Sequence, residues 1–280
     1  MRDRSSGPLP GARRVHAITL HFHPDWPSQR GTVVDSMVAD DRYLSQFVTG
    51  SSNGGLTAVQ GGDRWLWESR LFEGRYDDRS ARSRPVYGAW NRTESPYGAS
   101  PRFGSAYIRL RSGLIDRSTF CYPDSAHGPE RVVDATKLKE LTREADEEAD
   151  RGRIDALDDY VEAHVHGPVM FSVDVAAVVL DPCYAGSPIE TAAHRLGCPI
   201  EFHPGFRVSA DDLDEAYRGP EAVALAHSLG GDLTPLTLGE AARRDDVAPR
   251  TLKHLWHYLA RFGRAPHTHE GRATDEPTAD

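Results

Sequence analysis

The sequence has few of the features that place a protein in a membrane or outside the cell. No apolar run approaches the roughly 20 residues that a membrane-spanning helix needs. The stretch Met1–Arg14 has arginines, glycine and prolines but no hydrophobic segment, which excludes a secretory signal. Cysteines are scarce: Cys121, Cys183 and Cys198 lie far apart, are odd in number and form no C-x-x-C pair. These absences predict a cytoplasmic protein with reduced thiols, no membrane partner and no cysteine zinc site.

An excess of positive charge is also missing. The 280 residues contain 33 Lys and Arg against 42 Asp and Glu, a net charge of -9, which disfavours nonspecific binding to nucleic acid or acidic membranes. Arg102, Arg109, Arg111 and Arg117 leave room for a local basic groove. Two nucleotide-binding motifs are absent as well. The chain has no G-x-G-x-x-G between a strand and a helix and no G-x-x-x-x-G-K-[ST], which excludes Rossmann and P-loop domains.

Glycine and small polar residues are concentrated in one short segment. Residues 49–55 read TGSSNGG, and another Gly-Gly pair follows soon after. Glycine permits positive φ and lets a ligand approach the backbone closely, while serine hydroxyls and free N–H groups supply short hydrogen bonds. The segment is therefore either a binding loop for a nucleotide or a sugar, through Ser51, Ser52, Asn53 and Gly54, or a glycine-rich surface turn.

Strand patterns dominate the middle of the chain and helix patterns follow, without regular βαβ alternation, which favours an α+β fold. Strands are predicted at 15–22, 106–110, 118–122, 160–165 and 173–180, with the second and third paired through a short turn. Helices are predicted at 33–47, 137–155, 220–229, 238–244 and 249–262. The last helix places Leu252, Leu255, Trp256, Leu259 and Phe262 on one face, a stripe typical of packing.

The same patterns predict the domain boundaries. The α+β domain is expected over 15–185, and a helical C-terminal extension packed on it over 186–263. The termini, 1–14 and 264–280, are polar and are predicted to be disordered.

Histidines at the end of the first predicted strand are candidate metal ligands. His21 and His23 alternate along the strand, so their side chains point to one face, and Asp25 follows just beyond. Further donors are available in His203, His164 and His166, and with His203 the first three residues contain the ligand types of a metal-dependent hydrolase. Alternatively, one of the two strand histidines hydrogen-bonds a ligand hydroxyl and the other is satisfied within the structure.

A second polar face lies on the predicted strand at 160–165. With a period of two residues, Tyr160, Glu162, His164 and His166 share one side. An unpaired carboxylate is costly to bury. The face of Glu162 is therefore either an exposed edge or the lining of a cleft.

An ordered series of motifs is similar to the bacterial family DUF3626, a domain of unknown function. The motifs are ITLHFHPD, SQFVTGSSNGGLTA, GGDRWLWE, RPVYGAWN, PRFGSAYIRL, RSTFCYPDS, DDYVEAHVHGPV and EFHPGF. The resemblance runs from about residue 18 to 263, nearly the whole chain, and implies no reaction.

The order of RPVYGAWN, FGSAYIRLRSGLIDRSTFCYPDS and YVEAHVHGPV also resembles the mono-ADP-ribosyltransferase-like domains attached to some phage head proteins. The resemblance implies a split antiparallel β-sheet cleft that holds NAD as substrate. Such domains carry an Arg or His on the first strand, a Ser-centred middle strand and a Glu on a later strand. Two departures stand out: Tyr160 occupies the position where many members have Glu or Gln, and Ser-Ser-Asn replaces Ser-Thr-Ser.

Carried over residue by residue, the resemblance assigns each of these roles to this chain. Glu162 is the catalytic carboxylate and His21, or its neighbour His23, grips the nicotinamide ribose or diphosphate. The segment Ser51–Asn53 supports the NAD pocket. Arginines including Arg64 are candidates for binding the diphosphate. Among the aromatics, Tyr87 is a candidate for stacking on nicotinamide and equally a core or rim residue.

Three functions follow as hypotheses. The first is an NAD-dependent ADP-ribosyltransferase or NAD glycohydrolase that uses Glu162 and needs no metal. The second is a metal-dependent hydrolase built from His21, His23, Asp25 and His203. The third is a noncatalytic nucleotide-binding module. For the first, the acceptor is open among protein, nucleic acid, small molecule and water, and the sequence sets no oligomeric state.

Overall fold

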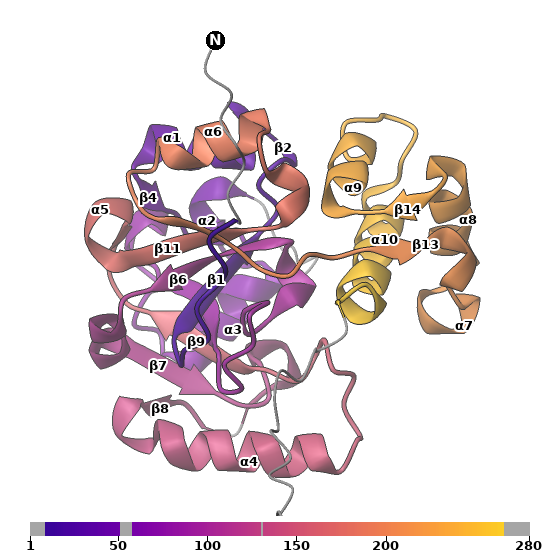
Figure 1. The fold of residues 1–280 in the computed structure, drawn as a ribbon. Coiled ribbons are helices and arrows are strands. Elements are labelled where there is room, and N and C mark those ends of the chain that lie inside the picture. Colours follow the sequence, from indigo (N-terminus) through magenta and orange to yellow (C-terminus); the bar gives the residue numbers. More distant parts are fainter. Residues whose placement is uncertain (1–8, 51–57, 130, 266–280) are drawn as a thin grey trace, which may run out of the picture.

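One mixed β-sheet forms the centre of the protein (Figure 1). A computed structural model describes residues 9–50, 58–129 and 131–265. Eight strands pair in the order β12-β11-β6-β1-β5-β9-β7-β8, and all neighbours are antiparallel except β11 and β12. The strands are β1 (Ile18–Phe22), β5 (Val86–Trp90), β6 (Ala106–Leu110), β7 (Ser118–Cys121), β8 (Val133–Asp134), β9 (Val161–Val165), β11 (Val175–Leu180) and β12 (Ile200–Phe202). This is the α+β class that the sequence predicts, and the described residues place eight strands in one sheet and three short pairs of strands outside it.

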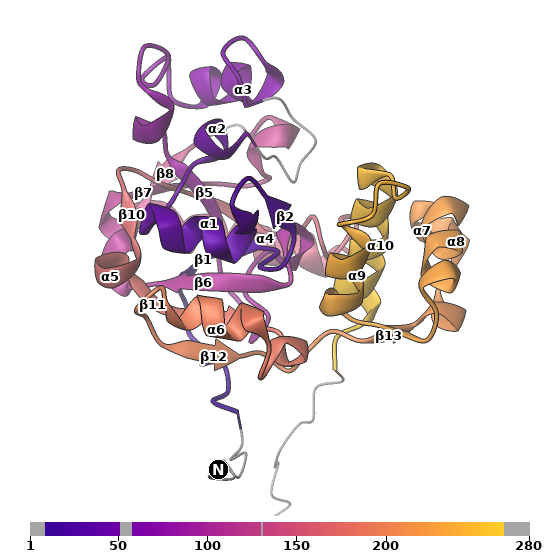
Figure 2. The ribbon, with the colours of Figure 1, turned by 90° about the horizontal axis from the view of Figure 1, so that it is seen from above.

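The middle of the sheet is buried on both faces. Every residue of β1, β6 and β9 is buried. The polar side chains on these strands are therefore shielded from solvent as well as the apolar ones. On one side α1 (Val33–Asp40) and α6 (Pro188–His194) lie next to each other and cover the sheet (Figures 1 and 2). At the β8 edge, α4 (Leu138–Asp150) buries Leu138, Leu141 and Ala145, and the other residues of this charged helix are exposed or half-buried. A polar residue inside this sheet therefore needs a partner or a cavity.

The C-terminal helices have a hydrophobic core of their own beside the sheet (Figure 1). They are α7 (Glu215–Arg218), α8 (Pro220–Leu229), α9 (Pro235–Ala241) and α10 (Pro249–Phe262), with a small hairpin of β13 (Val208–Ser209) and β14 (Asp232–Leu233). The predicted stripe on α10 is buried except for Phe262, which is 53% exposed at the last turn. The indole N–H of Trp256 donates to the carbonyls of Pro101 and Arg102, which ties α10 to the main domain.

Three local predictions differ from the structure. The strands β6 and β7 do not pair, because residues 112–117 form a 3-10 segment and β7 pairs with β9 and β8 instead. The helix predicted over 33–47 ends at Asp40, where Asp41 takes a left-handed conformation with φ 51°. Residues 10–13, assigned by sequence to a disordered tail, run along β12 and exchange main-chain hydrogen bonds with Phe202. Residues 1–8 and 266–280 lie outside the described part of the chain.

Short elements connect the main ones. They are β2 (Pro27–Ser28), β3 (Gly31–Thr32), β4 (Arg42–Tyr43), β10 (Val169–Met170), α2 (Gln46–Thr49), α3 (Asp63–Leu71) and α5 (Phe171–Asp174), with 3-10 turns at Ala81–Ser83, Pro101–Phe103, Ser112–Arg117, Ser125–His127, Ala135–Lys137, Pro182–Tyr184 and Ala210–Asp212. Over the described ranges, no helix is both long and apolar enough to cross a bilayer.

Candidate functional site

A cavity of about 570 Å³ opens beside β1, β5 and β9. This volume is in the range of small-molecule sites. Five residues that the sequence analysis selected line it: His21 from β1, His23 just after that strand, Arg64 from α3, Tyr87 from β5 and Glu162 from β9. They come from distant parts of the chain, and the pairing of β5 with both β1 and β9 brings three of them together.

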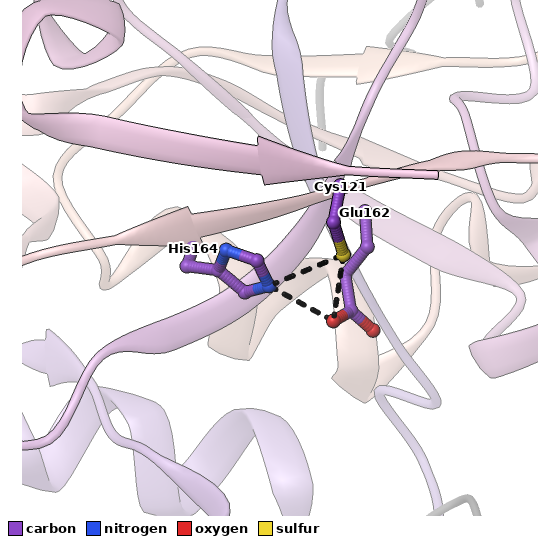
Figure 3. Close-up of side chains that lie close together, drawn as sticks. All are labelled: Cys121, Glu162 and His164. Atoms are coloured by element: carbon purple, nitrogen blue, oxygen red, sulfur yellow. Dashed lines mark hydrogen bonds and ion pairs between the residues drawn. The ribbon is translucent and has the colours of Figure 1, made fainter. Parts of the chain in front are cut away.

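Glu162 lies on β9 opposite Ala89 of β5 and Cys121 of β7. Its side chain is almost fully buried, and its Oε1 lies 2.9 Å from Nε2 of His164. The thiol of Cys121 points at the same pair, with Sγ 3.9 Å from Glu162 Oε1 and 3.8 Å from His164 Nε2 (Figure 3). The predicted common face of β9 is therefore present, and it faces the cavity and the protein interior, not solvent.

Hydrogen bonds extend from His164 across β7 to the segment after α3. Thr119 Oγ1 lies 3.1 Å from His164 Nδ1 and 2.9 Å from His166 Nε2, and His166 Nδ1 lies 2.6 Å from the hydroxyl of Tyr76. A hydroxyl both donates and accepts, and a neutral imidazole has one donor and one acceptor nitrogen. The contacts from Tyr76 through His166 and Thr119 to His164 can therefore run in either direction. The last contact, from His164 Nε2 to an ionised Glu162, is a hydrogen bond only when Nε2 carries the imidazole proton.

Burial controls the ionisation of the groups around Glu162. Desolvation, with the nearby Glu162 charge second, raises the pKa of the Cys121 thiol well above its ordinary value. Desolvation lowers the pKa of His166 to about 4, so this imidazole is neutral at pH 7. The pKa of Tyr160, whose ring also lines the cavity, is raised well above its usual value for the same reason. Burial thus keeps the Cys121 thiol, the His166 imidazole and the Tyr160 hydroxyl neutral at pH 7.

The other wall of the cavity is cationic. Arg64 is 8% exposed, its guanidinium carbon lies 4.8 Å from the centre of the Tyr87 ring, and its Nε has no hydrogen-bond partner among the described residues. The Tyr87 hydroxyl donates to Glu68 Oε2 at 2.9 Å, and Glu68 also pairs with Arg84. Tyr87 is thereby held in place. Three further arginines line the cavity: Arg30, Arg42 and Arg82.

The structure does not bring the predicted metal set of His21, His23, Asp25 and His203 together. His21 Nδ1 donates to the carbonyl of Gly104 at 3.2 Å and its Nε2 accepts from a main-chain N–H, so neither ring nitrogen is free. His23 is stacked 3.9 Å from the Trp26 ring. Both nitrogens of His203 are likewise bonded to main-chain groups. In the described part of the chain, the group with metal-ligand spacing is Cys121, Glu162 and His164.

Asp25 is fully buried between β1 and α9, and this burial sets a pH dependence of stability. Desolvation raises its pKa from 3.8 to about 6, and Tyr184 and Arg243 oppose the shift only in part. The folded state holds this proton more tightly than the unfolded state, so the contribution to stability is full below pH 4 and is lost as pH rises through 6.

Asp25→Asn is therefore expected to be more stable than the wild type at pH 8 by on the order of 2–3 kcal/mol, and equally stable at pH 4. Thermal unfolding of both proteins from pH 4 to 8 measures the difference. Asp245→Asn, at an exposed position, is the control and is expected to change Tm little at any pH. A constant difference between Asp25→Asn and the wild type across this range would contradict the prediction.

Part of the predicted site lies outside the described residues, namely Ser51, Ser52, Asn53 and Gly54. The preceding residues, Thr49 and Gly50, line the cavity.

Several residues at the site were not predicted. Cys121 and Thr119 stand two apart on β7, opposite Glu162 and His164, and an alternating polar pattern on a second strand was the available signal. Glu68 and Arg84 carried no recognisable pattern, because they meet only through the packing of α3 on β5.

The fold and the site together define an α+β protein with a central mixed sheet and a cavity that ends at a buried acid–imidazole–thiol group. A family model described as "Protein of unknown function (DUF3626)" matches residues 17–136 and 127–262. The chain belongs to this family, which confirms the first resemblance. No curated protein matches the chain. The family description names no reaction, so it gives no support to the second resemblance, to ADP-ribosyltransferase-like domains.

Proposed function

We propose that the protein cleaves the nicotinamide–ribose bond of NAD and transfers ADP-ribose to water or to another acceptor, with Glu162 as the essential carboxylate. The observation that carries the proposal is the position of Glu162: a buried carboxylate at the wall of a cavity of about 570 Å³ that also contains His21, Tyr87 and Arg64. Burying a carboxylate costs folding free energy, so its position at a ligand-sized cavity favours a role in binding or catalysis over a role in stability.

The positions of the histidine strand and the glutamate strand are compatible with the choice of NAD. The resemblance implies a first strand with a histidine, a Ser-centred middle strand and a glutamate strand. The histidine strand β1 and the glutamate strand β9 lie on either side of β5, which has no serine, and the residues assigned to the Ser-centred role, Ser51–Asn53, lie outside the described residues. On the middle strand it is Tyr87 that lines the cavity. We include in this proposal the split-sheet cleft that the resemblance implies.

The chemistry needs few groups. The bond between C1′ of the ribose and the ring nitrogen breaks, nicotinamide leaves with the electron pair, and the ribose develops oxocarbenium character, as in glycoside hydrolysis. A carboxylate beside the ribose stabilises this positive charge more in the transition state than in the ground state. The nucleophile then adds to C1′ and its proton is released. Glu162 supplies the negative charge, and His164 holds its orientation through the 2.9 Å contact.

The cationic wall fits the other end of the same ligand. Arg64 has a buried Nε without a partner in the described part of the chain, and an anionic group such as a diphosphate oxygen would satisfy it. The cavity has four arginines against the carboxylates of Asp40 and Glu162, so a dianionic diphosphate is favoured there. Tyr87 offers an aromatic face beside them.

The two alternatives differ in what supports them. The metal-dependent hydrolase loses its original ligand set, since the nitrogens of His21 and His203 are bonded to main-chain groups. The noncatalytic module is compatible with the same cavity and predicts NAD binding without turnover.

Purified protein incubated with NAD, with and without EDTA, tests the proposal. Nicotinamide and ADP-ribose are quantified, and NAD binding is measured by calorimetry in parallel. Release of nicotinamide that persists in EDTA is expected. Binding without release would favour the noncatalytic module, and neither binding nor release would contradict NAD as the ligand.

Arg64→Met is expected to raise the Kd for NAD about 10-fold to 100-fold, because a hydrogen bond to a charged group contributes about 1.5–3 kcal/mol. Methionine keeps an apolar stem of similar length but loses the guanidinium that lies over the Tyr87 ring. Calorimetric titration with NAD measures the effect. Arg70→Met, on the same helix but exposed, is the matched control and is expected to leave Kd unchanged. Equal Kd values of Arg64→Met and Arg70→Met for NAD would show that Arg64 does not bind it.

A further inference from the structure

We propose that Cys121, Glu162 and His164 form a binding site for Zn²⁺, and that an ion bound there inhibits the enzyme. The site itself depends only on the three side chains; the inhibition rests on the proposed function of Glu162. The first of the three hypotheses from sequence needs no metal, and the ion proposed here is a regulator and not a participant in the reaction.

The spacing of the three ligand atoms is the first argument. Sγ of Cys121, Oε1 of Glu162 and Nε2 of His164 are separated by 3.9, 3.8 and 2.9 Å. Tetrahedral zinc with bonds of about 2.0–2.3 Å has ligand atoms about 3.4–3.6 Å apart. Two separations shorten by a few tenths of an ångström and the third opens by about 0.5 Å, which side-chain rotations accomplish.

The positions of the ligands are the second argument. Cys121 and Glu162 are direct cross-strand partners on β7 and β9, and His164 is two residues further along β9. All three side chains point toward one another (Figure 3). Because the strands of the sheet, and not a loop, hold the three ligand residues, little conformational entropy is lost when an ion binds. Thiolate, imidazole and carboxylate together favour Zn²⁺ over Mg²⁺ or Ca²⁺.

The hydrogen bonds behind His164 are the third argument. A metal-binding histidine commonly donates its other ring N–H to an acceptor, which fixes the tautomer. Here Nδ1 lies 3.1 Å from Thr119 Oγ1, and Thr119 can donate onward to His166 Nε2 at 2.9 Å. His166 Nδ1 then donates to the Tyr76 hydroxyl. In this direction the imidazole proton of His164 is on Nδ1, so Nε2 has a lone pair toward Glu162 Oε1 and a cation can bind both atoms without displacing a proton.

Binding and its consequence follow from these positions. The Cys121 thiol releases its proton to solvent when the Zn–S bond forms, and the imidazole and the carboxylate bind without losing one. Of the three ligands, Glu162 lines the cavity, so the fourth position is available to water from that side. The ion neutralises the carboxylate that the proposed reaction needs, and NAD cleavage stops.

Titration of the protein with Co²⁺, followed by absorption, tests the site without reference to activity. Cobalt is a spectroscopic probe for zinc sites, and we expect a near-ultraviolet thiolate charge-transfer band, tetrahedral visible bands, and displacement of both by one equivalent of Zn²⁺. In Cys121→Ser the charge-transfer band is expected to vanish and the Kd for Zn²⁺ to rise at least about 100-fold. Loss of a residue that only hydrogen-bonds to a metal ligand already weakens metal binding about 10-fold to 100-fold, and loss of a ligand should weaken it at least as much. Cys183→Ser is the matched control with the band retained.

Cys121→Ala serves the same purpose if a hydroxyl disturbs the buried strand. Absence of the band in the wild type, or its persistence in both Cys121 variants, would overturn the site. Inhibition is measured separately, as nicotinamide release with Zn²⁺ relative to each protein's own rate in EDTA. We expect at least a tenfold loss in the wild type and little in Cys121→Ser.

The two proposals fail in distinguishable ways. A cobalt spectrum without any nicotinamide release in EDTA keeps the metal site and rejects NAD cleavage. Release without a cobalt spectrum keeps NAD cleavage and rejects the metal site. Metal binding at Cys121 with full activity in Zn²⁺ would reject the inhibition.

Discussion

Replacement of Glu162 by glutamine is expected to lower the rate constant of nicotinamide release at least about 100-fold to 1,000-fold, the effect of removing one preorganised electrostatic group from a transition state. Glutamine keeps the size of the side chain and one carbonyl oxygen that can accept from His164 Nε2. The negative charge that stabilises the oxocarbenium ion is lost. Because the ribose of NAD becomes positively charged only in the transition state, the Kd for NAD is expected to change little.

Three measurements separate this effect from damage to the fold. Thermal unfolding of Glu162→Gln is expected to match that of the wild type, and calorimetry gives the NAD affinity. Asp40→Asn removes another carboxylate from the same cavity and is expected to retain turnover. If Glu162→Gln turned over NAD like the wild type, the carboxylate would not be catalytic. A large fall in Tm would instead show that Glu162 is structural.

Gly104→Ala is expected to destabilise the fold by about 3 kcal/mol or more, and so to lower Tm by roughly 6–12 °C. A Cβ at this position would lie 2.2 Å from the carbonyl carbon and oxygen of Phe22. These are main-chain atoms of the central strand β1, which cannot move aside as a flexible side chain would. The φ of Gly104 is 166°, an extended value open to any residue, so the effect is a collision and not backbone strain.

The cavity should be affected together with the fold, because the Gly104 carbonyl accepts the hydrogen bond from His21 Nδ1. Thermal unfolding and the far-ultraviolet circular dichroism of the soluble fraction measure the change. Gly113→Ala is the matched control: its Cβ would meet nothing within 4 Å, and its Tm is expected to shift by less than about 2 °C. Similar stabilities for the two variants would show that β1 can yield at Phe22.

The sequence predicted best those features that depend on neighbouring residues. The helix over 249–262 coincides with α10 because a 3.6-residue stripe and an initial proline mark it. The strand over 160–165 became β9, and its period of two residues placed Glu162 and His164 on one face. The pairing of β6 with β7 was wrong, since a short connection favours a hairpin but does not require one.

The metal hypothesis shows the limit of reasoning from ligand types. His21 and His23 have the spacing of metal ligands, yet their rings are taken up by main-chain hydrogen bonds and by stacking on Trp26. Nothing in the local sequence reports what a ring nitrogen will contact, because the partners at Ser100 and Gly104 are about 80 residues away.

The sequence by itself determined the family, the α+β class and the polar face of β9 that carries Glu162. Only the tertiary structure decided what that face meets. Cys121 is 41 residues from Glu162 in the chain, and β7 and β5 lie on either side of β9 through pairings that no local pattern encodes. The choice among such pairings depends on how the whole sheet buries its apolar surface. The local pattern therefore selects the side chains of this site, and the folded sheet brings them together.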